Sequence, residues 1–363
     1  MRRALPLTIA ILMPLLIIGV VTYSDRVVSP SPAPSQPDTD PRHGRWWNLM
    51  PFFADQNTLS GFDLAFGVFD GTDTGSVSRR YGPLTGESMR GAIPVADGTL
   101  DGTLAAAYWD GVRSEVWTVQ AQTGQETLIT RTPDVVSALA FSHDERSLFI
   151  ATRDPLSRLP KAILQVPISG GPALSIAALD VALGPDVSFE MLSSADGSLV
   201  FLVCGSDCRL QALDTASGLV RWSASTPLGT LAGGTPSTIV ERPRACEQPC
   251  EATAFDLANG ERFSIGFVCS AAVVVTEPAS LVSDADEGTC RVDSYMLVRW
   301  PLDADRGAVI FERPDDARAL VTSDERTGYA VDPGWVVLAP RGEIGGAADA
   351  WFVRVSDGLV IQR

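Results

Sequence analysis

Six cysteines are the side chains of this sequence best suited to covalent or metal chemistry. An even number of cysteines in an oxidising compartment predicts three disulfides. Two C-x-x-x-C pairs that converge from neighbouring repeats would instead suit a metal ion, and free or mixed thiols are a third possibility. We favour disulfides, because the N-terminal segment indicates a location outside the cytoplasm. The cysteines form two close pairs and two single residues: Cys204 with Cys208, Cys246 with Cys250, Cys269, and Cys290.

Groups for nucleophilic or acid–base catalysis are sparse. Only two histidines occur, His43 among prolines and His143 in a polar turn beside Asp144. A serine triad needs a base that an acid orients, and the sequence has no G-x-S-x-G elbow to present a nucleophile. We therefore predict no catalytic residue, no cofactor-binding residue and no enzymatic activity.

Acidic turns raise the question of calcium, which needs six or more oxygens around one ion. None of them has the D-x-[DN]-x-[DN]-G-x5-E spacing of a calcium loop. Aspartate is common in turns because it hydrogen-bonds to its own backbone. We therefore predict no metal site. The acidic residues concerned are Asp70, Asp73, Asp284, Asp286, Glu287, Asp303 and Asp305.

A turn that ends in glycine, placed between two alternating apolar runs, recurs along the chain. Its copies are separated by 49, 47, 47, 42, 47 and 51 residues, and a period of roughly 40–50 residues is typical of one four-stranded propeller blade. The sequence therefore predicts an all-β fold, a β-propeller of about seven four-stranded blades, with six or eight as alternatives. The glycines are Gly75, Gly124, Gly171, Gly218, Gly260, Gly307 and Gly358.

The clearest copy of this turn runs from Asp214 to Gly218, within R-L-Q-A-L-D-T-A-S-G-L-V-R-W. Glycine at its end adopts positive φ without steric cost. The stretch resembles the repeat of pyrroloquinoline-quinone-type propellers, and the next copy, A-F-D-L-A-N-G with Asp256 and Gly260, resembles it in part. The resemblance implies that the aspartate caps the turn and that Trp222 packs between blades.

A second phrase, S-A-L-A-F-S-H-D-E-R-S-L-F-I-A at 137–151, resembles the inner-strand hairpin of WD-repeat propellers. The two phrases together resemble the quinoprotein-like and WD-repeat-like superfamily of bacterial propellers. A resemblance to the quinoprotein enzymes would imply a larger, eight-bladed ring and a vicinal cysteine pair. This sequence has no Cys-Cys pair, so we do not expect their cofactor.

The way in which the ring closes stays open at this point. The first repeat has little room for four strands before Gly75, whereas the last repeat ends with its own outer strand at 359–362. An aromatic cluster at Trp46, Trp47, Phe52 and Phe53 opens the folded part, and we interpret it as a first strand that packs in the core.

The N-terminus predicts the compartment. After residues 1–3, which would stay in the cytoplasm, residues 4–24 form an uncharged, mostly apolar run that is just long enough to cross a bilayer. This run is a membrane anchor or, alternatively, a signal that is cleaved to give a secreted protein. Residues 25–43 are rich in proline and predict an extended linker, and residues 44–363 predict the propeller domain.

Charge narrows the class of partner. With 44 acidic and 28 basic side chains the formal net charge is -16, which repels polyanions and makes a nucleic-acid partner unfavourable. The sequence favours a binding or scaffold module, tethered to the cell membrane on its outer side, for a protein or cell-envelope ligand. The alternative is an extracytoplasmic lactonase-like or cyclase-like hydrolase with an axial metal. The sequence does not determine the oligomeric state.

Overall fold

The computed structural model describes the part of the chain that forms the sheets and their tight turns. The predicted anchor, nearly all of the proline-rich linker, His43, Cys246, Cys269 and Cys290 lie outside the described residues. Within them no helix is long and apolar enough to cross a membrane. The described residues are 27–28, 44–53, 59–69, 77–81, 95–97, 103–120, 123–179, 187–194, 196–205, 207–226, 229–243, 250–268, 272–276, 278–285, 294–302, 307–314, 318–320, 327–330, 334–340 and 350–362.

The described strands form seven sheets, and in each of them neighbouring strands pair antiparallel apart from one added edge strand. Three consecutive sheets lie in the middle of the chain. They are β9(Val135–Phe141), β10(Ser147–Arg153), β11(Pro160–Pro167) and β12(Leu174–Ala178); β13(Ser188–Ser193), β14(Ser198–Cys204), β15(Cys208–Asp214) and β16(Val220–Thr226); and β17(Gly229–Gly234), β18(Thr238–Pro243), β19(Cys250–Asp256) and β20(Arg262–Val268).

The other four sheets follow the same plan of a meander. They are β5(Val95–Asp97), β6(Thr103–Trp109), β7(Ser114–Gln120) and β8(Glu126–Thr132); β21(Ala272–Thr276), β22(Ala279–Ala285), β23(Ser294–Pro301) and β24(Gly307–Pro314), with β1(Val27–Val28) added parallel to β24; β25(Arg318–Leu320), β27(Trp335–Pro340), β28(Trp351–Arg354) and β29(Val360–Gln362); and β26(Thr327–Ala330), β2(Gly44–Phe53), β3(Leu59–Phe69) and β4(Val77–Tyr81).

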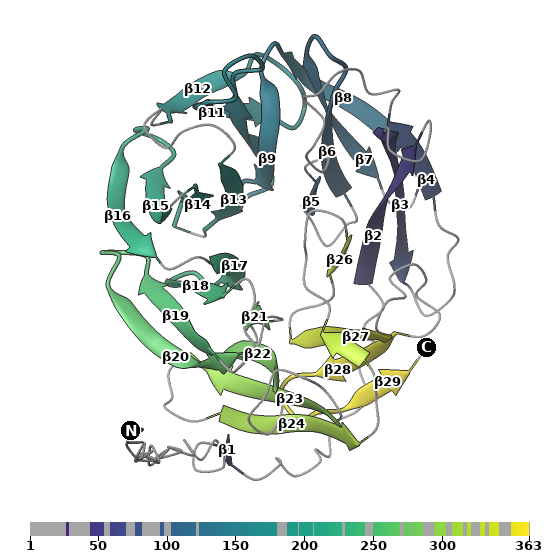
Figure 1. Cartoon of the computed structure of the whole chain (residues 1–363), viewed down its shortest axis with the longest axis vertical. Helices are drawn as coiled ribbons and strands as arrows, with labels where there is room; N and C mark the ends of the chain where they lie inside the picture. Colours follow the sequence, from purple (N-terminus) through teal and green to yellow (C-terminus); the bar gives the residue numbers. More distant parts are fainter. Residues whose placement is uncertain are drawn as a thin grey trace, which may run out of the picture.

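Figure 1 shows the sheets arranged around a central axis, with strands such as β9, β13, β17 and β21 nearest the axis and β12, β16 and β20 at the rim. The first strand of each of these sheets adjoins the first strand of the next, as β13 adjoins both β9 and β17. This is the arrangement of a β-propeller, so the prediction of an all-β propeller is confirmed.

Burial follows from a strand's place in its sheet. Every residue of the second strand β14, S-L-V-F-L-V-C, is buried, because this strand has a sheet packed on each face. The outer strand β16 buries only one residue, Trp222. The apolar core therefore lies in the seams between consecutive sheets, and one such cluster joins Val200 and Leu210 of one sheet to Ile239 and Phe255 of the next.

The ring closes because a strand from the C-terminal part of the chain joins the first sheet. The strand β26 leaves the last sheet between β25 and β27 and pairs antiparallel with β2, with Arg45 opposite Ala330 and Asn48 opposite Thr327. It supplies the innermost strand of the first sheet. The short first repeat thus obtains its fourth strand from a point more than 30 residues before the C-terminus, and β29 completes the last sheet on its own.

Candidate functional site

The two ends of the sheets carry turns of different kinds. We call the end with the third-to-fourth-strand turns, such as 214–220 and 256–262, the repeat-turn end. We call the opposite end, with the second-to-third-strand turns at 109–114, 153–160 and 204–208, the stapled end. The third strand of every sheet runs from the stapled end to the repeat-turn end, so the two sets of turns lie on opposite sides of the ring.

At the repeat-turn end the aspartates cap their own turns. The Asp214 carboxylate accepts hydrogen bonds from the backbone N–H groups of Ala216 and Ser217 at 3.1 and 2.8 Å. The backbone N–H of Gly218 donates to the Asp214 carbonyl at 2.9 Å, and its φ is 71°. Hydrogen bonds from Ser217, through its backbone first and then its hydroxyl, hold the pKa of Asp214 below its usual range.

The same turns also lock neighbouring sheets together. The Trp222 indole N–H donates to the Leu257 carbonyl at 2.8 Å, in the turn between Asp256 and Gly260, and the ring stacks on Phe255 with centroids 6.4 Å apart. A Cβ on Gly260 would lie 2.8 Å from that indole. Asp256 caps its own turn in the same way, since its carboxylate accepts from the Ala258 N–H. The five residues predicted for the repeat turns therefore all have structural partners, and each of the two turns packs on the sheet before it.

At the stapled end the turn between β14 and β15 is closed by a disulfide between Cys204 and Cys208. The prediction of a disulfide is confirmed for these two cysteines, whose pairing the sequence left open. The two residues are also opposite each other in the strand register. Cys250, the first residue of β19, has the place of Cys208 in the next sheet and is also disulfide-bonded. All described cysteines are oxidised.

Two further turns at the stapled end are fixed by aspartate caps and expose an apolar tip. The Asp110 carboxylate accepts from the backbone N–H of Val112 at 2.8 Å, and the Asp154 carboxylate accepts from that of Leu156 at 3.0 Å. In each turn the residue two places after the aspartate projects outward, so that Val112 is 77% and Leu156 is 93% exposed. Hydrogen bonds from Ser157 lower the pKa of Asp154.

Exposed cations near these tips form ion pairs with buried carboxylates. The Arg131 Nε lies 2.8 Å from Glu115 Oε1, and the Lys161 Nζ lies 2.7 Å from Asp134 Oδ1. A hydrogen bond from the Arg131 side chain holds the pKa of Glu115 below its usual range, although burial acts in the opposite direction. The surface at this part of the ring therefore presents cations and aliphatic groups, with the acids beneath them.

One buried carboxyl departs from the internal repeat. The position is found by counting seven residues back from the turn glycine, which leads to the third strand, and then taking the register partner on the second strand. In six sheets this second-strand residue is buried and points toward the preceding sheet. It is apolar in five of them and a glutamate in the sixth. These residues and their partners are Ala106 with Trp117, Ile150 with Leu164, Phe201 with Gln211, Glu241 with Thr253, Leu281 with Trp300, and Leu338 with Trp351.

Glu241 is 3% exposed and lies at the stapled end of the seam between the β13–β16 and β17–β20 sheets, which we call the Glu241 seam. Neither of its carboxyl oxygens receives a hydrogen bond of regular geometry. Burial raises the pKa of Glu241 to about 7; an interaction with the Thr226 hydroxyl and the charge of Arg262 oppose the rise, and the charge of Glu190 adds to it.

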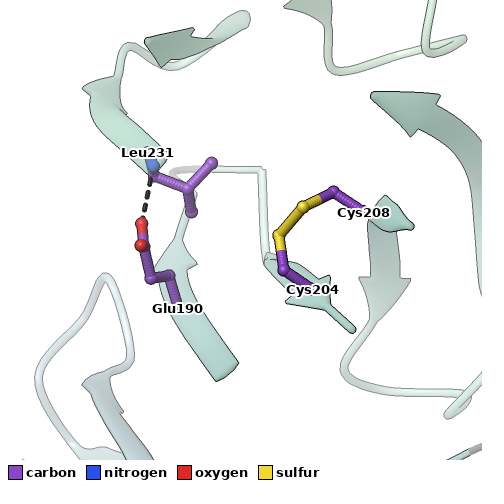
Figure 2. Close-up of a disulfide and its surroundings, with 4 residues drawn as sticks. All are labelled: Glu190, Cys204, Cys208 and Leu231. Atoms are coloured by element: carbon purple, nitrogen blue, oxygen red, sulfur yellow. Dashed lines mark hydrogen bonds between the residues drawn. A yellow bond between two sulfur atoms is a disulfide. The ribbon is translucent and has the colours of Figure 1, made fainter. Parts of the chain in front are cut away.

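The Glu241 seam also holds the stapled turn. The Glu190 carboxylate, on β13, accepts a hydrogen bond from the backbone N–H of Leu231 on β17 at 2.6 Å, and so joins the innermost strands of the two sheets. Figure 2 shows this bond beside the Cys204–Cys208 disulfide. Both cysteine side chains are part of the apolar cluster that fills the seam. A carboxyl with a pKa near neutrality thus shares a seam with a covalently closed turn.

Glu241 is not among the site residues expected from the sequence. It lies in T-I-V-E-R-P, a short run that shows no motif of its own. A signal was present in the repeat, because aligning the copies by their turn glycines sets Glu241 against leucine, isoleucine, phenylalanine and alanine. That comparison requires the strand register, which identifies the second-strand residue that pairs with a given position before the turn glycine.

Other residues that the sequence brought into question have ordinary places. His143 is exposed in the turn between β9 and β10, where Asp144 accepts a hydrogen bond from the Ser142 hydroxyl at 2.6 Å. Asp284 is buried near the end of β22. The other acidic residues considered for calcium lie outside the described residues. Among those that are described, no group of three or more His, Cys, Asp and Glu side chains is placed to hold a metal ion.

Comparison with known proteins supports the fold. No protein-family model matches the sequence, and no curated protein matches it. Among solved structures, an oligogalacturonate lyase in complex with manganese is similar over 88% of this chain and 85% of its own, with a TM-score of 0.52 and 10% identity. A protein from Lactobacillus plantarum is similar over 88% and 94%, with a TM-score of 0.53 and 11% identity.

A third similar structure is a prolyl endopeptidase, over 91% of this chain but 49% of its own, with a TM-score of 0.54 and 10% identity. At such identities the likeness concerns the fold alone. The chain is a β-propeller, and because enzymes are among the similar structures, the fold is compatible with either a binding or a catalytic role.

Proposed function

We propose that the chain is a ring of seven blades, tethered to the cell membrane and lying outside the cytoplasm, that binds a protein or cell-envelope ligand through its stapled end. The proposal depends chiefly on the difference between the two ends of the sheets. At the repeat-turn end the same turn recurs and is occupied with holding neighbouring sheets together. At the stapled end the three described turns differ in sequence, and each is fixed within itself by an aspartate cap or a disulfide.

A binding face benefits from turns that are rigid before the ligand arrives, because less conformational entropy is then lost on binding. The Cys204–Cys208 disulfide and the caps of Asp110 and Asp154 provide that rigidity. The exposed Val112 and Leu156 provide apolar contacts that the fold does not use. Function in propellers belongs to such turns on a fixed scaffold rather than to the fold.

The tether and its side of the membrane are supported by the sequence and by the disulfide. Residues 4–24 are long and apolar enough to span a bilayer. Disulfides persist in oxidising compartments and are rare in the cytosol, and Cys204 and Cys208 are joined. A secreted form, released by cleavage after the same run, would present the same stapled end.

The test is an affinity pull-down from cell-envelope extract with the full chain in detergent. A variant with Val112→Asp and Leu156→Asp is compared with Leu219→Asp, a matched control at the repeat-turn end whose leucine is 68% exposed. We expect a ligand that the parent chain and the control retain and that the double variant loses at least tenfold. Retrieval of nothing above background by the parent chain, or equal retention by the double variant, would contradict the proposal.

A further inference from the structure

The burial of the Glu241 side chain costs free energy. An isolated carboxylate in a buried site loses its hydration, and the site must supply hydrogen bonds or a close cation in return. The seam supplies little of either, since no regular hydrogen bond reaches the Glu241 oxygens. The five equivalent positions are apolar and no more than 2% exposed, and they show that the fold itself does not need a carboxyl here. A residue that breaks its own repeat at such a cost indicates a function.

The groups that face Glu241 come from every strand around it. Across the seam they are Glu190 on β13 and Thr226 at the end of β16. Within its own sheet they are Gly229, whose added Cβ would lie 2.7 Å from Glu241 Oε1, and Thr253, the register partner. The charged groups that act on its titration are Arg262 and Glu190.

The cation is only a partial counter-ion. The Arg262 Nη2 donates to the Thr253 hydroxyl at 3.3 Å, and Glu190 brings a like charge from the opposite sheet while it holds the Leu231 N–H. An ionised Glu241 would therefore face another carboxylate across the seam. A protonated Glu241 is neutral and packs like the leucines of the other seams.

We propose that the Glu241 seam is a proton-dependent joint, closed when Glu241 is neutral and loosened when Glu241 is ionised, which sets how firmly the stapled turn of one sheet is held against the next. This inference stands on the burial and the neighbours of Glu241 and does not require that the stapled end binds a ligand. The moving parts are β17, with its Leu231 N–H, and the end of β16. The disulfide keeps the Cys204–Cys208 turn itself intact while the sheets separate.

The sign follows from the direction of the shift. The pKa of Glu241 is raised from an ordinary 4.5 to about 7 when the seam is closed. Below about pH 4.5 the carboxyl is protonated in both the closed and the open seam, so closure is strongest there. Between about 4.5 and 7 the open seam loses the proton and the closed seam keeps it, and the opening constant rises up to about tenfold per pH unit. Above about 7 it levels off.

The experiment is hydrogen exchange of the full chain between pH 4.5 and 8, corrected for intrinsic exchange rates and followed in the segments 229–234 and 220–226. We expect protection of these segments to fall by about two orders of magnitude across the range. Glu241→Gln, which keeps the shape without a charge, should remove the pH dependence. Glu241→Leu, the residue of two other seams, should also remove it and leave the seam closed.

The neighbouring seam provides the internal control, because Phe201 has the place of Glu241 there. Segment 174–178 of that seam, which contains none of the groups that face Glu241, should show no matching change with pH. A pH dependence that persists in both Glu241 variants, or that appears equally in the Phe201 seam, would overturn the proposal. If one variant fails to fold, the other decides the result, since both lack the titrating group.

Discussion

The repeat-turn end and the stapled end of the ring are built on the same strands, and aspartates cap turns at both ends, but the repeat turns in addition pack on the neighbouring sheet. At the repeat-turn end, glycine and tryptophan pack against the next sheet, as Trp222 does against Gly260 and the Leu257 carbonyl. At the stapled end, turns are held within themselves by a disulfide or an aspartate cap. The first arrangement joins sheets to one another, whereas the second fixes the shape of each turn by bonds within that turn.

The difference has a physical consequence for what can vary. A turn that packs on the next sheet must keep its shape in every copy, because its glycine leaves no room for a side chain. A turn that is closed on itself can change sequence without disturbing the ring. Internal repetition therefore marks the structural end of this molecule, and internal variation marks the end that we propose binds a ligand.

The largest effect is expected at the repeat-turn end, from Trp222→Ala. This change removes a buried ring from the Glu241 seam together with its hydrogen bond to Leu257, and we expect the free energy of unfolding to fall by about 3–5 kcal/mol. Chemical denaturation with urea measures it. Phe263→Ala, on the next outer strand and 38% exposed, is the control and should cost less than about 1 kcal/mol. Equal losses would show that the contact of Trp222 with the next sheet adds nothing beyond an ordinary half-exposed aromatic ring.

A smaller effect separates close packing from backbone conformation. Gly218 and Gly197 both have positive φ, of 71° and 82°. A Cβ on Gly218 would collide with the Ile176 carbonyl of the preceding sheet, whereas a Cβ on Gly197 would meet nothing within 4 Å. We expect Gly197→Ala to cost about 1 kcal/mol, for conformation alone, and Gly218→Ala to cost about 1–2 kcal/mol more. Thermal unfolding of both variants measures the difference, and similar melting temperatures would show that packing against Ile176 is unimportant.

Much of the fold could be predicted from the sequence because it repeats. The regular spacing of the turn glycines indicates how many residues one four-stranded sheet takes up. The alternation of apolar residues on either side of each glycine indicates where the strands lie. The even number of cysteines predicted disulfides but not their pairing. The bond between Cys204 and Cys208 becomes evident only from the strand register, which sets the two residues opposite each other.

Two features escaped prediction for a shared reason, which is that each depends on contacts between distant parts of the chain. The pairing of β26 with β2 joins residues 279 to 285 positions apart, and the four residues of β26, T-G-Y-A, carry no strand pattern. Glu241 looks like an ordinary surface residue in its local sequence. Its burial arises from β13 and β16 of the preceding sheet, which no window around residue 241 contains.

The smallest effect is expected at the stapled end, from the double variant Cys204→Ala and Cys208→Ala. A disulfide that closes a loop of five residues restricts the unfolded chain only slightly, and removing it should lower the free energy of unfolding by about 2 kcal/mol. The side chains remain small and apolar within the seam, so the ring should stay closed, as judged by an unchanged far-ultraviolet spectrum and urea denaturation. A loss larger than that of Trp222→Ala would reverse the comparison, because the stapled end would then carry the stability that we assign to the repeat turns.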